Sequence, residues 1–155
     1  MQGQQFEIHI RSNSSRPEEW KRAMEASAEE LKKHPLNEWQ KETAKRFGIT
    51  EEEYARGELA GVYGRQRLES VGQDLGKIIE RLLTEIGEGY HLQSLLYEGV
   101  KFRWIARVES SQGTRNLSIQ RDLVDDVVDS EVYESVQELK RRLMEGLGEM
   151  PSSKE

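Results

Sequence analysis

Basic side chains gather on one face of a strongly alternating segment, Val100 to Glu109. Successive side chains of a strand point to opposite faces. One face would therefore carry Val100, Phe102, Trp104, Ala106 and Val108, and the other would carry Lys101, Arg103, Ile105, Arg107 and Glu109. Between Tyr97 and Arg121 there are five basic residues and two acidic ones. Because cationic side chains bind phosphates and carboxylates, we expect a basic sheet face here.

Further polar residues would share this face if the first and last strands of the chain join the same sheet. The candidate binding residues are Arg11, Lys101, Arg103, Arg107, Arg115, Asn116, Ser118 and Gln120. His9 would lie beside them. The face could be an ordinary solvated surface, a contact surface for a partner protein, or a phosphate-binding surface for nucleic acid. The sequence leaves these three interpretations open.

An acidic segment follows directly. Between Asp122 and Glu138 the chain has seven carboxylates and no basic residue. A calcium loop needs a fixed ligand spacing and a central glycine, which this segment lacks. Apolar residues alternate with the acids as on an amphipathic turn, namely Leu123, Val124, Val127 and Val128. We interpret the segment as a solvated helix face, with an acidic docking surface as the alternative, and predict no metal site.

Residues for catalysis are few. The only histidines are His9, His34 and His91, and they form no HExxH motif or close pair. The chain has no Gly-x-Ser-x-Gly elbow, no phosphate loop and no dinucleotide-binding fingerprint. We therefore predict no catalytic residue and no cofactor. An enzyme would need a pocket, assembled by the fold, that holds a histidine with carboxylates.

The segment from Gln40 to Thr50, QKETAKRFGIT, resembles the first half of a helix-turn-helix. Ala44 would sit where the helices touch, Gly48 in the turn, and Ile49 and Tyr54 at buried positions. The resemblance covers about 20 residues. It departs from the family where DNA would be bound, because Glu51, Glu52 and Glu53 open the second helix.

A second segment, RNLSIQRDLVDDVV from Arg115, is similar to a ribbon-helix-helix. The resemblance implies that Asn116, Ser118 and Gln120 enter the major groove of DNA, and that the strand pairs with its twofold mate in a dimer. A second helix would begin near Ser135. The usual glycine between the helices is missing, and a preceding strand is available for pairing within the chain.

The elements that position these residues follow from the hydrophobic period. Alternation predicts strands at 6–10, 90–97, 100–109 and 115–120, and the last three form an antiparallel meander. Helical spacing predicts helices at 17–31, 37–47, 65–86 and 132–147, with Trp39 and Phe47 on the inner side of the second. Three glycines from Gly57 to Gly64 predict a break or a close backbone contact. The order β-α-α-α-β-β-β-α indicates a two-layer α+β fold, with an antiparallel sheet of about four strands and helices packed on one face.

Length and composition limit the remaining possibilities. The 155 residues suit a single domain at 1–149, followed by a disordered tail at 150–155. A formal net charge of −6 argues against nonspecific binding of nucleic acid or acidic lipid by the whole surface. The chain has no cysteine and no apolar run near the roughly 20 residues that span a bilayer. We expect a cytoplasmic protein without a membrane partner.

Three functions remain open. The first is a non-enzymatic binding or regulatory protein that acts through protein–protein contacts, and neighbouring patches of opposite charge leave room for a homodimer. The second is a nucleic-acid-associated regulator that uses the basic sheet face. The third is a small enzyme with a histidine and carboxylate site.

Overall fold

The computed structural model describes residues 6–11, 15–130 and 132–149. These residues form six helices and one four-stranded sheet, which confirms a mixed α+β fold. The chain divides into two units, Met1–Ser12 with Leu68–Glu155, and Asn13–Arg67. The first holds the sheet and the second is helical. The predicted single domain stays a prediction, and the predicted tail at 150–155 lies outside the described residues.

The sheet contains β1 (Glu7–Arg11), β2 (His91–Glu98), β3 (Arg103–Ser110) and β4 (Gly113–Gln120), in the order β1-β2-β3-β4. As predicted, β2, β3 and β4 form an antiparallel meander. The prediction of a purely antiparallel sheet is wrong, because β1 pairs with β2 in parallel. The physical reason is the connection: a long helical crossover brings the chain back to start β2 in the same direction as β1.

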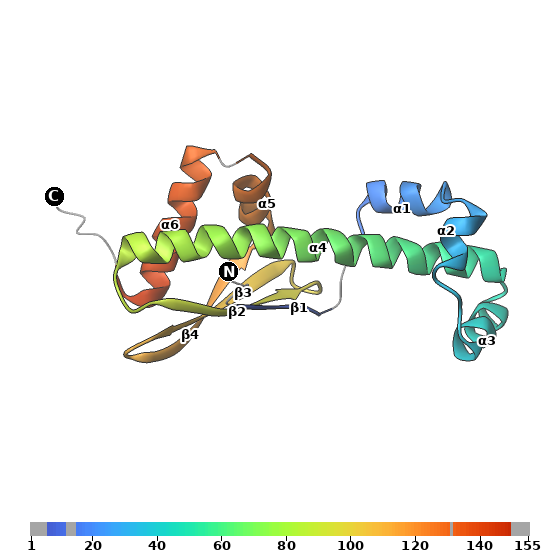
Figure 1. The fold of residues 1–155 in the computed structure, drawn as a ribbon, viewed down its shortest axis with the longest axis horizontal. Helices are drawn as coiled ribbons and strands as arrows, with labels where there is room; N and C mark the ends of the chain where they lie inside the picture. The colour runs from blue at the N-terminus through green and yellow to red at the C-terminus, as the bar shows by residue number, and fades with distance from the viewer. Residues whose placement is uncertain (1–5, 12–14, 131, 150–155) are drawn as a thin grey trace. The chain divides into compact units, whose positions relative to one another are not determined.

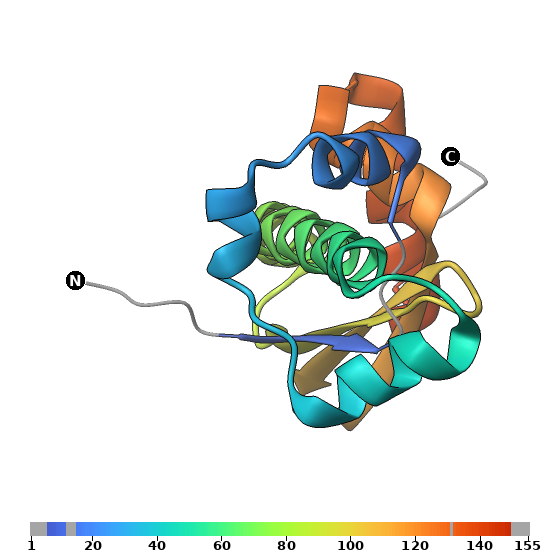
Figure 2. The same ribbon diagram turned by 90° about the vertical axis from the view of Figure 1, so that its right-hand side faces the viewer.

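Helices cover one face of this sheet. The C-terminal part of α4 (Glu51–Ile86) lies on the same side as α5 (Arg121–Ser130) and α6 (Tyr133–Leu147) (Figure 1 and Figure 2). Their apolar side chains share one core with alternate residues of the strands. Trp104 and Tyr97, whose ring centroids are 5.2 Å apart, are fully buried in it. In α5 the acidic segment forms an amphipathic helix, with Val124 and Val127 buried and Asp122, Asp126 and Asp129 exposed.

The turn between β2 and β3 is longer than predicted. The strand begins at Arg103 rather than Val100, and Val100 is 79% exposed. Phe102 has a positive φ of 52°, which is uncommon for a bulky residue. Three backbone hydrogen bonds hold this turn: Gly99 N–H donates to the Arg11 carbonyl, Phe102 N–H to the Gly99 carbonyl, and Arg121 N–H to the Phe102 carbonyl. The alternation therefore predicted β3 correctly from Arg103 onward, where β2 and β4 pair with it, but not from 100 to 102.

The helical unit contains α1 (Pro17–Met24), α2 (Ala28–Lys32), α3 (Glu38–Phe47) and the part of α4 up to Arg67. One helix was predicted from 17 to 31, but the chain breaks it where Ser27 caps α2 by accepting from Glu30 N–H. Arg56 stabilises the break because its Nη1 donates to the carbonyls of Ala23, Met24 and Ala26 at 2.9–3.0 Å. Ala23 and Met24 lie in the last turn of α1, where carbonyls have no partner four residues further along the same helix.

Local signals fixed the start of α3 and of α4. Asn37 and Gln40 form a reciprocal capping box, and so do Thr50 and Glu53. No break occurs at the glycines of α4, and Gly57 is not a position of close approach, since a Cβ there would lie in ordinary contact 3.7 Å from the Trp20 ring.

The inward side of α3 is smaller than predicted. Thr43 and Ala44 are buried, whereas Trp39 is 66% exposed and Phe47 is 70% exposed. The core of this unit, formed by Ala23, Leu59, Ala60 and Tyr63, is too small to cover both aromatic rings.

Candidate functional site

The face of the sheet that the helices of its unit leave uncovered carries most of the predicted binding residues. We call it the open face. It is formed by alternate residues of the four strands, opposite in direction to the buried ones. Its members are Glu7, His9, Arg11, Ser94, Leu96, Glu98, Arg103, Ile105, Arg107, Glu109, Asn116, Ser118 and Gln120.

Strand register aligns all of these side chains except Glu109 in three rows across the sheet. The Arg107 row contains Glu7, Ser94, Arg107 and Asn116. The Ile105 row contains His9, Leu96, Ile105 and Ser118. The Glu98 row contains Arg11, Glu98, Arg103 and Gln120. Side chains directly opposite each other on one face lie about 5 Å apart, so each row forms a continuous surface.

The open face has balanced charge, which corrects the expectation of a basic face. It carries three arginines, Arg11, Arg103 and Arg107, and three glutamates, Glu7, Glu98 and Glu109. The local count of basic residues was misleading, since it combined the two faces and the turn. Arg115 points to the helix side, where its Nη1 donates to the Gly146 carbonyl at 3.0 Å. Lys101 lies exposed in the turn before β3.

Two of the three arginines are already paired. Arg103 Nε donates to Glu98 Oε1 at 2.7 Å, and Arg11 Nη1 lies 3.6 Å from Glu98 Oε2. The hydrogen bond from Arg103 lowers the pKa of Glu98, and the charges of Arg103, Lys101 and Arg11 act in the same direction. The carboxylate therefore stays ionised, and the Glu98 row is an ion-pair network in which one carboxylate contacts two arginines.

Arg107 differs from these two arginines. Within residues 6–11, 15–130 and 132–149 it has no hydrogen bond or ion pair, and its side chain is exposed. Ser94 and Asn116 are its cross-strand neighbours. Two shallow hollows of about 560 and 610 Å³ share Glu7, Ser94 and Arg107. Arg107 is thus an unneutralised guanidinium at the meeting point of two concave areas.

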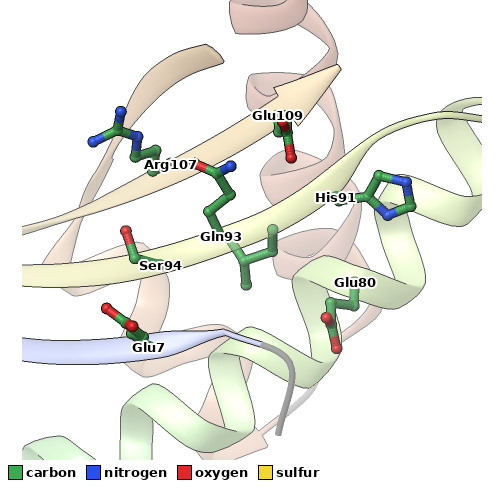
Figure 3. Close-up of a pocket in the computed structure, with 8 residues that line it drawn as sticks. Glu7, Glu80, His91, Gln93, Ser94, Arg107 and Glu109 are labelled. Atoms are coloured by element: carbon green, nitrogen blue, oxygen red, sulfur yellow. The ribbon is translucent and has the colours of Figure 1, made fainter. Parts of the chain in front are cut away.

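The first hollow holds a histidine with carboxylates. Figure 3 shows Arg107, Ser94 and Glu7 on one side of it and His91 and Glu80 on the other. His91 is also the cross-strand partner of Glu109. This meets the condition stated for an enzyme, so the enzyme hypothesis stays a prediction.

The other two histidines are at separate places. His9 lines the second hollow and its Nε2 lies 3.1 Å from Glu7 Oε1. His34 belongs to the helical unit, with Nε2 3.9 Å from Glu30 Oε2. Among the residues whose placement is described, no group of three or more histidine, aspartate or glutamate side chains could hold a metal ion.

Sequence reasoning missed the apolar middle of the open face. Leu96 and Ile105 are cross-strand partners and are half-buried between the two charged rows. The alternation already placed Ile105 with the arginines. Pairing it with Leu96 requires the register, because β2 contains a bulge between Leu92 and Ser94 that shifts its alternation.

The segments that resemble DNA-binding families have the predicted local elements. Gly48 ends α3 in the left-handed conformation and α4 follows at Glu51, but Ile49, predicted to be buried, is exposed. β4 pairs with β3 of the same chain, which occupies one edge of the strand that would pair with a twofold mate. α5 and α6 then follow from Arg121 and Tyr133.

Comparison with protein-family models, with curated proteins and with solved structures finds no match for this chain. In the part of the chain that is described, no helix is long and apolar enough to cross a membrane. Any assignment of function therefore rests on the geometry of the open face.

Proposed function

We propose that this is a non-enzymatic binding protein that acts through protein–protein contacts at the open face. The observation that carries the proposal is the apolar pair Leu96 and Ile105 between the ion-paired Glu98 row and the Arg107 row. Protein interfaces have a less charged centre within a polar rim and are enriched in arginine. The open face has this arrangement of side chains, and its hollows make it concave.

The charge of the face favours a protein over a nucleic acid. Surfaces that bind DNA are strongly positive, since neutralising phosphates provides much of the affinity. Here three glutamates oppose three arginines. A mixed surface of this kind suits a partner with both charges, and a second copy of the chain has that composition.

We place the protein in the cytoplasm on the strength of its cysteine-free sequence alone.

A photocrosslinking experiment tests this proposal. p-Benzoylphenylalanine replaces Ser118 in the Ile105 row, and in a matched variant it replaces Gln137, which is exposed on α6. After irradiation in the cells that make the protein, we expect protein adducts from position 118 but none from 137. The substitution Leu96→Glu should suppress them, because it places a charge in the apolar middle of the face.

The products distinguish the alternatives. An adduct of twice the mass of the chain would identify a homodimer. An adduct with nucleic acid, or equal adducts from positions 118 and 137, would overturn the proposal.

A further inference from the structure

We infer that the open face binds an extended peptide segment in which an acidic side chain pairs with Arg107 and an apolar side chain covers Ile105. This inference rests on the proposed function and specifies the chemistry of the partner. Its starting point is the unequal state of the three arginines. Arg11 and Arg103 contact Glu98, whereas Arg107 has no partner among the residues that the structure describes.

The groups around Arg107 favour a carboxylate as its partner. A guanidinium binds a carboxylate through two parallel hydrogen bonds. Ser94 and Asn116 flank it across the strands and offer hydroxyl and amide donors to the same ligand. Glu7 is two strands away, about 10 Å by strand spacing, and its carboxylate lies 3.1 Å from His9 Nε2. Among the described residues, no carboxylate forms an ion pair with Arg107.

The spacing along β3 defines the length of the motif. Arg107 and Ile105 are two residues apart on one face of a strand, which corresponds to about 7 Å. An extended peptide also repeats its side chains on one face every two residues, at the same distance. An acidic residue and an apolar residue separated by one position would therefore meet Arg107 and Ile105 together.

The neighbouring charge defines the direction of the motif relative to β3. Glu109 follows Arg107 on the same face, on the side away from Ile105. A second acidic residue of the peptide beyond the first would meet Glu109 and be repelled. The expected peptide therefore has an apolar residue over Ile105, an acidic residue two positions further at Arg107, and a residue that is not acidic two positions further again at Glu109. The same order along β3 is expected whether the peptide runs parallel or antiparallel to the strand.

A peptide selection tests this inference with the full chain. A display library of random 12-residue peptides is selected on the wild-type protein and on two charge-reversed variants. Arg107→Glu removes the proposed partner. Arg46→Glu is the matched control, since Arg46 is exposed on α3, has no ion pair with another described residue, and changes the net charge equally.

We expect the wild type and Arg46→Glu to enrich the acidic and apolar pattern, and Arg107→Glu not to enrich it. A synthetic peptide of that pattern should bind Arg107→Glu at least about tenfold more weakly, the scale of a charge-assisted hydrogen bond. Replacing the acidic residue of the peptide by arginine should restore binding to Arg107→Glu. Such a rescue cannot result from misfolding of the variant.

Two results would overturn the inference: enrichment of peptides without an acidic residue, or no enrichment at all. The photocrosslinking experiment distinguishes either of these results from failure of the proposed function. If position 118 still yields protein adducts, the open face binds a partner of different chemistry. If position 118 yields none, the binding function itself is wrong.

Discussion

Gly76 lies on the side of α4 that packs against Phe6, the residue immediately before β1. A Cβ built at Gly76 would overlap the Phe6 ring, and this ring is buried in the core of the sheet unit. We therefore predict that Gly76→Ala destabilises the protein. This is the reverse of the usual effect of alanine in a helix interior.

The magnitude follows from two opposing contributions. Alanine is favoured over glycine in a helix by about 1 kcal/mol. Forcing an extra carbon into a packed core costs about 1–3 kcal/mol. Because the Phe6 ring is buried and has little room to move, we take the upper end of that range. The expected net loss is about 2 kcal/mol in the free energy of unfolding.

Urea denaturation followed by circular dichroism measures this loss. Gly57→Ala is the matched control in the same helix, since its Cβ would lie an unstrained 3.7 Å from the Trp20 ring. We expect it to stabilise by up to about 1 kcal/mol. In a Phe6→Leu background Gly76→Ala should cost far less, because the planar ring is gone. Equal stabilisation by Gly57→Ala and Gly76→Ala would refute the packing argument.

Two further predictions concern α6 and α3. Hydrogen bonds from Arg141 and Arg142 lower the pKa of Glu138 to about 2. Since this folded-state pKa is below the ordinary value of 4.5, Glu138 stabilises the fold above pH 4.5 and progressively less down to about pH 2. A carboxyl titration by NMR should show the low midpoint, and the stability of Glu138→Gln should vary less over that pH range; a midpoint near 4.5 would contradict the ion pairs. Phe47 is 70% exposed, so Phe47→Ser should change the free energy of unfolding by no more than about 0.5 kcal/mol. A loss of 2 kcal/mol or more in the same urea assay would show that the ring is covered.

The predicted elements agree with the structure where the signal is local. The alternation of β1, β3 and β4 and the helical stripe of the C-terminal part of α4 are both confirmed. At the start of α4, Thr50 and Glu53 form a capping box, which is a local sequence signal as well. The helix predicted at 17–31 is wrong because Arg56, about thirty residues further along the chain, stabilises the break between α1 and α2. No local pattern contains that interaction.

The sequence predicted most of the residues of the candidate site but not the balance of charge on its surface. Alternation alone placed Arg11, Arg103, Arg107, Asn116, Ser118 and Gln120 on one face. The same alternation places Arg115 with Leu117 and Ile119 on the helix side, so Arg115 lies off the open face. The charge count overstated the positive charge of the face, because it included Lys101, Arg115 and Arg121, which lie off the face, and did not include Glu7 of another strand.

The sequence by itself determined which side chains of each strand point the same way, since the two-residue period is a property of the backbone. It also determined where several helices begin, because capping acts over three residues. Only the tertiary structure decided that β1 runs parallel to β2, that Glu98 lies between two arginines, and that Arg107 has no ion pair with any residue whose placement is described. Those facts depend on strand order and register, which are set by packing between residues far apart in the chain.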